Sequence, residues 1–210
     1  TTERLVGTAY PVIAEHQRAH DVARSWLYFG LTRLGIGMLE AADESWSHAE
    51  TQWRELGRPL HIHRILLQRS WISVFRGRFA EAVELVAQAR EFLDQWPRSS
   101  WLQYARLDDH LGNIWRADAL ADMNFDGIGE PTDDLKVSEA RYAASLGVTR
   151  VEPGSDQHRS AMAKLEQAAD LKIPAALAVD SVRYSMTDAD ARWRWAAHVS
   201  GRTLASAFAV

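Results

Sequence analysis

The chain has no cysteine, only three lysines and no long apolar run among its 210 residues. The missing cysteine excludes disulfides, thiolate metal sites and a Cys/His catalytic dyad within this chain. No segment approaches the roughly 20 apolar residues that a membrane-spanning helix needs. The first nine residues also lack the basic region and apolar core of a signal peptide. We therefore expect a cytoplasmic protein.

Neither sign of charge is in large excess, because the chain has 28 acidic and 24 basic residues and a formal net charge of -4. Nucleic acid and anionic lipid both attract clustered positive charge, so neither is favoured as a partner. The 47% of hydrophobic residues and nine tryptophans are typical of a folded globular chain. We expect one domain over residues 1–210, whose partner is a protein or a peptide.

Helical periodicity dominates the sequence, and no run alternates apolar and polar residues as a strand would. The sequence therefore predicts an all-α fold. The expected helices are 22–39, 46–56, 62–75, 79–96, 101–123, 132–146, 155–171, 174–184 and a last one from Asp188, capped by Thr187. The polar segment 43–45 is expected to end the first helix. Gly57 and Gly77 are expected in tight turns, where glycine suits a left-handed C-terminal cap.

A short pattern recurs in the second helix of each expected pair. Trp46 and Ala49 align with Phe79 and Ala82 of the next pair, and residues 137–140 repeat the theme. A small alanine one turn after a bulky residue lets a paired helix approach closely. Helix pairs that repeat every ~34 residues are the tetratricopeptide pattern.

Residues 76–89 resemble the turn and second helix of a tetratricopeptide repeat. The residues at its characteristic places are Gly77, Phe79, Ala82, Val86 and Ala89. Ser70 stands where the first helix usually has a small residue, and Gly37 is the equivalent in the preceding pair. The resemblance covers 22–147, followed by a helical extension over 151–210. It implies an α-solenoid of antiparallel helix pairs.

The tail carries a second resemblance. Residues 178–184 and 187–193 are similar to segments of bacterial tetratricopeptide proteins that carry a CHAT domain, which is caspase-like. That resemblance implies an effector domain outside this chain, whose activity the repeats regulate. An apolar helical pattern still runs at residues 207–210, so we expect the chain to be a piece of a longer protein.

One loop resembles an EF-hand calcium site. In residues 122–133 the oxygen ligands at loop positions one, three and five are Asp122, Asn124 and Asp126, with Gly127 at position six. Gly129, Pro131 and Asp133 depart from the pattern at positions eight, ten and twelve. A connector loop rich in Asx and glycine is the favoured interpretation, and a calcium-binding protein is the alternative.

The remaining polar clusters predict no metal, cofactor or catalysis. His16 and His20 are four residues apart but have no evident third ligand. His61 and His63 are two apart and point to different sides of a helix. In the segment 108–110 two aspartates precede a histidine, yet neighbouring helical residues diverge by about 100°. We expect a chain without enzyme activity; an unrecognised helical enzyme is the other alternative.

A concave groove lined by the first helices 22–38, 62–75 and 101–115 is the expected binding site. The candidate partner-binding residues are Arg33, Gln68, Tyr104 and Arg106. Six arginines form either an anion-binding patch or, as we expect, a mixed solvated surface: Arg98, Arg106, Arg116, Arg141, Arg150 and Arg159. Four tryptophans are expected mainly in the core: Trp26, Trp46, Trp53 and Trp71.

Overall fold

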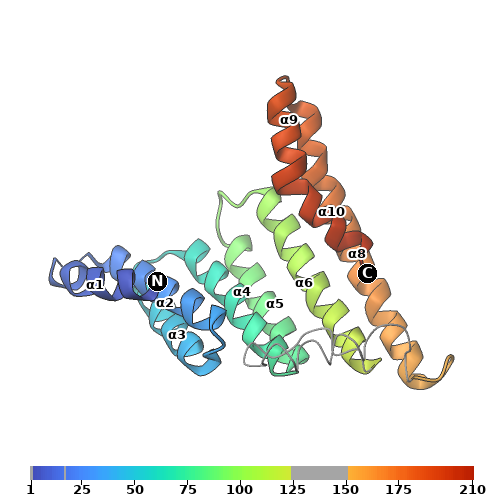
Figure 1. The fold of residues 1–210 in the computed structure, drawn as a ribbon, viewed down its shortest axis with the longest axis horizontal. Coiled ribbons are helices and arrows are strands. Elements are labelled where there is room, and N and C mark those ends of the chain that lie inside the picture. Colours follow the sequence, from blue (N-terminus) through green and yellow to red (C-terminus); the bar gives the residue numbers. More distant parts are fainter. Residues whose placement is uncertain (1, 17, 124–150) are drawn as a thin grey trace. The chain divides into compact units, whose positions relative to one another are not determined.

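A computed structural model describes residues 2–16, 18–123 and 151–210, and every regular element in these ranges is helical (Figure 1). The described residues form two compact units, with residues 2–16 and 18–97 in unit 1 and residues 98–123 and 151–210 in unit 2. The α-helices are α1 (Thr2–Glu15), α2 (Ala19–Gly35), α3 (Leu39–Glu55), α4 (Pro59–Phe75), α5 (Phe79–Asp94), α6 (Trp101–Asp122), α8 (Asp156–Ser181), α9 (Ala189–Trp195) and α10 (Gly201–Phe208). The all-α prediction is confirmed for the described residues. The predicted repeats over 22–147 cross the boundary between the units, and the prediction of one domain stays a prediction.

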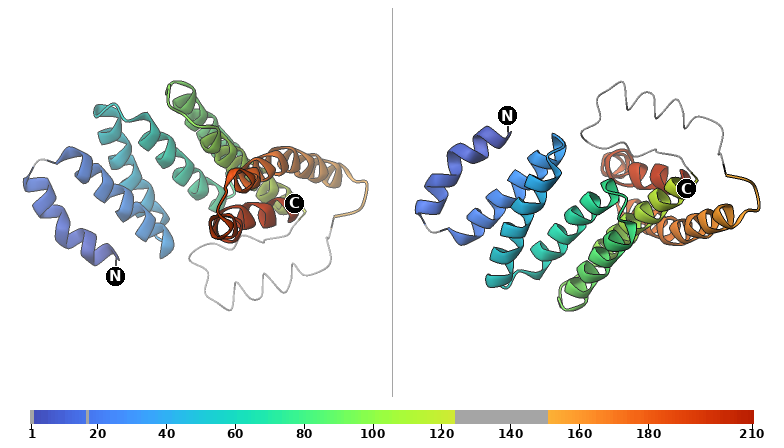
Figure 2. Two further views of the ribbon diagram at one scale, coloured as in Figure 1. Left: turned by 90° about the horizontal axis from the view of Figure 1, so that it is seen from above. Right: turned by 90° about the horizontal axis from the view of Figure 1, so that it is seen from below.

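Unit 1 is a row of helices in which each packs against the next one in sequence, from α1 to α5 (Figure 2). Helices α2, α3 and α4 have 17 residues each, and α5 has 16. Gly37, Gly57 and Gly77 end α2, α3 and α4 with positive φ angles of 80°, 60° and 68°. Glycine adopts this conformation without the strain that a Cβ would add. The three turns are evenly spaced along the chain, and so are the helices that they separate.

The turn at Gly37 corrects the first predicted boundary. The amide of Gly37 donates to the carbonyl of Leu34 at 3.0 Å, and the next amide reaches Arg33, which closes α2 as in a Schellman motif. The polar segment 43–45, expected to end a helix, lies inside α3. Ser45 is fully buried there, and its hydroxyl donates to the carbonyl of Ala41 at 2.6 Å. The polar side chain is satisfied within its own helix, so it does not break it.

The alignment of Trp46 with Phe79 was also wrong, because helices α3 and α5 begin 40 residues apart. The pairs at this spacing are all buried: Ala42 and Ala82, Trp46 and Val86, Ala49 and Ala89, and Trp53 and Leu93. The error of seven residues equals about two helical turns, so the shifted alignment still matched the same helix face. A pair of 40 residues is longer than the ~34 of a tetratricopeptide repeat.

The core of unit 1 depends on a close contact between α2 and α3. A Cβ placed on Gly30 would overlap the indole of Trp46, which is fully buried and donates to the carbonyl of Leu27 at 3.2 Å. Ser70, buried in α4, lies 40 residues after Gly30. The small residue equivalent to Ser70 is therefore Gly30, and Gly37 belongs to the turn.

The four tryptophans expected in the core of unit 1 differ in their burial. Trp46 and Trp53 are buried, whereas Trp26 and Trp71 are only half-buried. The indole of Trp26 lies 4.7 Å from the imidazole of His48, measured between ring centroids. The expectation that most of the four lie in the core is therefore confirmed for the two tryptophans of α3, whereas the two on α2 and α4 are partly exposed.

Unit 2 is built around α8, which packs against both α6 and α10. The predicted boundary at Pro174 was wrong, because α8 runs without interruption from Asp156 to Ser181. Proline removes one helical N–H, but its φ angle fits a helix, and buried Lys172, Ala175 and Ala176 hold both sides of it in the core. Asp188, and not Thr187, caps α9 by accepting from two backbone amides. The expected helix 132–146 lies outside the described residues.

Two lysines of α8 form ion pairs with α6. Lys172 is completely buried, and its ammonium donates to Asp109, Asn113 and Ser206 at 2.7 to 2.8 Å. A Cβ on Gly112 would overlap the Lys172 side chain, so this glycine makes room for it. Two turns earlier, the Lys164 ammonium contacts two carboxylates of α6 at 2.7 Å, those of Asp118 and Asp122.

Candidate partner-binding surface of unit 1

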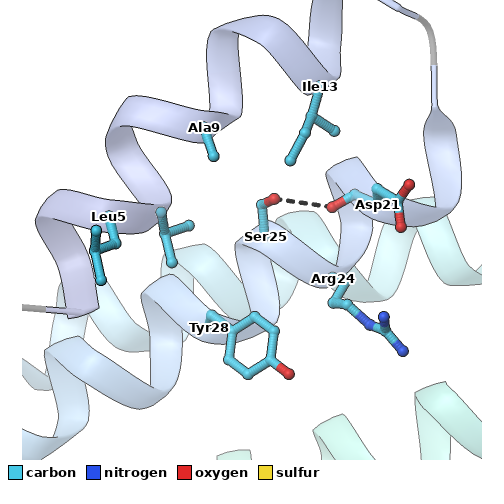
Figure 3. A pocket seen from close by; sticks show the side chains of 8 residues that line it. Leu5, Ala9, Ile13, Asp21, Arg24, Ser25 and Tyr28 are labelled. Atoms are coloured by element: carbon cyan, nitrogen blue, oxygen red, sulfur yellow. Dashed lines mark hydrogen bonds between the residues drawn. The ribbon is translucent and has the colours of Figure 1, made fainter.

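A shallow groove of about 300 Å³ lies between α1 and α2 (Figure 3). Its lining residues are Leu5, Val6, Ala9 and Ile13 from α1 and Asp21, Arg24, Ser25 and Tyr28 from α2. Leu5, Ala9 and Ile13 point from α1 toward α2 in Figure 3. Small side chains at Ala9 and Ser25 leave the space open, because neither fills the gap between the helices.

The groove presents mainly apolar surface. The hydroxyl of Ser25 donates to the carbonyl of Asp21 at 2.8 Å, so it is satisfied by its own helix. Leu5 is 68% exposed and Tyr28 45% exposed, although both are large apolar side chains. A concave site with mainly apolar lining and a few polar groups such as Arg24 has the composition of a ligand-binding groove.

Asp21, Arg24 and Tyr28, which line the groove, also belong to a set of equivalent residues on α2 and α4, which we call the α2–α4 face. It comprises three pairs of residues at the 40-residue spacing: Asp21 and His61, Arg24 and Arg64, and Tyr28 and Gln68. Intervals of three, four and seven residues keep each set on one side of its helix. All six side chains are exposed or half-buried.

A stack of rings fixes the beginning of α4 relative to α2 and α3. The imidazole of His61 stacks on the buried indole of Trp53 with 4.1 Å between centroids. His20, at the start of α2, meets both rings edge-on, at 4.8 Å from Trp53 and 5.5 Å from His61. The first turns of α2 and α4 are therefore held next to each other.

Positive charge gathers at these first turns. The pKa of His61 lies below its ordinary value because of burial, then because of His20 and the guanidinium groups of Arg24, Arg58 and Arg64. All three arginines are exposed, and within the described part of the chain no hydrogen bond or ion pair engages them. The carboxylate of Asp21 is nearby, 3.8 Å from the Arg18 guanidinium and 3.7 Å from the imidazole of His20.

Other arginines of unit 1 contrast with these three. Carboxylates lie within ion-pair distance of Arg33, Arg54, Arg69, Arg76 and Arg78. Their charge is therefore partly neutralised by the fold, whereas that of the α2–α4 face is presented to solvent.

The predicted groove residues fall in both units. Arg33 ties helices together, since it donates to the hydroxyl of Ser45 at 2.6 Å and lies 3.5 Å from the carboxylate of Glu3. Gln68 lies on the α2–α4 face and is half-buried. Tyr104, half-buried, and Arg106, exposed, belong to α6 of unit 2.

Sequence reasoning missed the three free arginines and Tyr28. The 40-residue spacing is a signal for part of this set, since it places Arg24 with Arg64 and Tyr28 with Gln68 on equivalent faces, but it does not single out Arg58. The alignment of Trp46 with Phe79 hid this relation.

The other candidate sites have structural partners. His16 and His20 do not share a helix, because α1 ends at Glu15 and α2 begins at Ala19. Buried His63 contacts the carbonyl of Ala89 through Nδ1 at 2.9 Å. In the ranges that the structure covers, no three His, Asp or Glu residues are grouped as a metal site would require.

The EF-hand-like loop lies outside the described residues except for Asp122 and Met123. Asp122 is the last residue of α6, and its carboxylate pairs with Lys164. Of the six arginines weighed as a patch, Arg116 donates to the carbonyl of Ala209 at 3.0 Å and Arg159 pairs with Asp156. Arg141 and Arg150 lie outside the described ranges.

No described helix combines the length and the apolar character needed to cross a bilayer.

Comparison with known proteins found no family model, curated protein or solved structure that matches this chain.

Proposed function

We propose that unit 1 is a short α-solenoid of antiparallel helix pairs, related to tetratricopeptide repeats in its packing, and that its α2–α4 face docks a peptide or a protein segment. Solenoids present the first helices of successive pairs on one extended surface, which suits recognition of an elongated partner. In this chain those helices are α2 and α4, whose equivalent residues lie 40 apart.

The observation that carries the proposal is the combination of an apolar groove with exposed polar side chains on one face. Binding sites typically combine apolar lining with a few polar groups that fix orientation. Leu5, Ala9 and Ile13 provide the apolar part, while Tyr28 and Gln68 provide aromatic and hydrogen-bonding groups. Tyrosine is among the residue types that most often dominate binding energy at interfaces.

The proposal assigns no catalytic step to this chain, because nothing on the α2–α4 face pairs a nucleophile with a base. It requires no cofactor. Regulation of an effector domain elsewhere in a parent protein, implied by the resemblance of the tail to CHAT-associated proteins, remains part of the proposal.

The test is affinity selection of random 12-residue peptides displayed on phage, with the immobilised full chain as bait. We expect enriched peptides whose binding is lost in Ala9→Trp, because the indole fills the groove. Thr8→Trp is the matched control, since Thr8 is exposed on α1 but does not line the groove. The proposal fails if no peptide is enriched, or if Ala9→Trp binds the enriched peptides as the parent does.

A further inference from the structure

Arg24, Arg58 and Arg64 have no carboxylate within ion-pair distance among the described residues, unlike five other arginines of unit 1: Arg33, Arg54, Arg69, Arg76 and Arg78. Arg24 and Arg64 occupy equivalent positions on α2 and α4, and Arg58 is the residue that precedes α4. The ring stack of His20, Trp53 and His61 holds the two helix starts together. All three guanidinium groups lie near enough to His61 to help lower its pKa, so their charges act on one part of the surface.

We propose that the partner of unit 1 is an acidic peptide segment, whose carboxylates pair with Arg24, Arg58 and Arg64 while an adjacent apolar side chain enters the groove between α1 and α2. This inference rests on the proposed docking function and specifies the chemistry of the partner.

Charge complementarity is the first argument for this partner. Arginine pairs with carboxylates through a planar fork of donors, and such charge-assisted bonds are stronger than neutral ones. Asp21 is the acidic residue of the face, and Arg18 and His20 lie close to it. The three free guanidinium groups therefore leave a local excess of positive charge, although the whole chain is acidic.

The groove supplies the second argument, because it favours a partner that has an apolar side chain next to its carboxylates. Arg24 lines the groove beside Tyr28, so a carboxylate bound to Arg24 brings the neighbouring side chain of the same peptide to Ser25 and Ala9. A phosphate backbone binds mainly through its charge, so it would pair with the arginines but would not fill the adjacent apolar groove. The combination favours a peptide over nucleic acid.

Fluorescence polarisation with labelled synthetic 12-residue peptides tests the inference on the full chain. Three peptides share a central leucine, flanked by Asp and Glu, by Ser and Gln, or by Lys. A labelled 20-base-pair DNA duplex is the fourth probe. We expect the acidic peptide to bind most tightly and to weaken steeply as salt rises, since ionic strength screens exposed charges.

Two charge-matched variants complete the design. Arg24→Gln/Arg64→Gln should weaken the acidic peptide about tenfold or more, as expected when anchor residues are removed. Arg192→Gln/Arg202→Gln changes the net charge equally at exposed arginines of unit 2 and should leave binding at the parental level. Circular dichroism and thermal melting show whether each variant keeps its fold.

The outcomes separate this inference from the docking function. If the neutral peptide binds as tightly as the acidic one and Ala9→Trp abolishes both, docking holds and the acidic partner is wrong. Tighter binding of DNA or of the Lys peptide also overturns the inference. Equal weakening by the two double variants assigns the effect to net charge and overturns it as well. If no peptide binds the parent chain, both proposals fail.

Discussion

Unit 1 and unit 2 both consist of helices packed on one another, but the chemistry of their closest contacts differs. In unit 1 a glycine of α2 admits the indole of Trp46, and the contact is closed by apolar surface and one hydrogen bond. In unit 2 a glycine of α6 admits the stem of Lys172, and the contact is closed by a buried ammonium with three oxygen partners.

The difference teaches why lysine suits position 172 of an arginine-rich chain. A lysine ends in a compact ammonium on a narrow stem, whereas a guanidinium is broad and planar. The ammonium of Lys172 lies between oxygens of Asp109, Asn113 and Ser206, all within 2.8 Å, where a broader guanidinium would need more space. Both lysines among the described residues, Lys164 and Lys172, lie at the contact of α8 with α6.

The largest effect is expected from breaking the buried network of unit 2. Lys172→Met leaves Asp109 and Asn113 without their buried partner, and breaking a buried ion pair costs ~3–5 kcal/mol. Urea unfolding monitored by circular dichroism measures the loss, and amide hydrogen exchange should localise it to α6 and α8.

The matched comparison for this substitution is Lys164→Met on the same helix. Its side chain is 22% exposed, and burial would lower its pKa, but hydrogen bonds and charges of Asp118 and Asp122 raise the pKa above its ordinary value. We expect a smaller loss, about 1 kcal/mol, because solvent replaces part of the interaction. Equal losses for the two variants would contradict the distinction between a buried and a half-buried lysine.

A second, intermediate effect is expected from the glycine contact of unit 1. Gly30→Ala places a methyl group against the indole of Trp46, and overpacking of this kind costs ~1–3 kcal/mol. Gly7→Ala makes the same change on α1 where nothing lies within 4 Å, so it should stabilise the chain by up to about 1 kcal/mol through helix propensity. Chemical denaturation compares the two; a Gly30→Ala variant as stable as Gly7→Ala would show that the contact adjusts without cost.

The smallest expected effect is a loss of stability at low pH, and it arises from a buried histidine of unit 1. Burial lowers the pKa of His63 below 6.5, and the hydrogen bond with Ala89 offsets this only in part. The unfolded chain therefore takes up a proton first as the pH falls, so stability is full above about pH 6.5 and declines below it. Urea midpoints from pH 8 to 5 measure the decline. His63→Gln should be less stable overall but should show a flatter dependence on pH, and an unchanged slope would exclude His63 as the source.

Helical periodicity was sufficient to predict the fold class, the glycine turns at Gly57 and Gly77 and most of α4, α5 and α6. It failed at Ser45 because hydrogen bonds satisfy a polar side chain that the pattern treats as a break. It failed at Pro174 because burial on both sides sustains the helix. In each case a tertiary contact outweighs the local preference.

The candidate site was harder to predict from the sequence than the fold. Gln68 and Arg33 were chosen alike because both lie on first helices. The structure places Gln68 on the α2–α4 face, whereas Arg33 already contacts Ser45 and Glu3. Which arginines are free depends on where the carboxylates of other helices lie. That information is tertiary, and periodicity along one helix does not contain it.

The even spacing of the turns at Gly37, Gly57 and Gly77 has a consequence for how this region can change in length. Each turn reverses the direction of the chain, so an insertion of one helix and its turn would invert every helix that follows. An in-frame duplication of two helices with their turns restores both the direction and the order of buried positions. Duplication or deletion of a helix pair therefore changes the length of this array without reversing the helices that follow. Each such step adds or removes one copy of the position that Arg24 and Arg64 occupy.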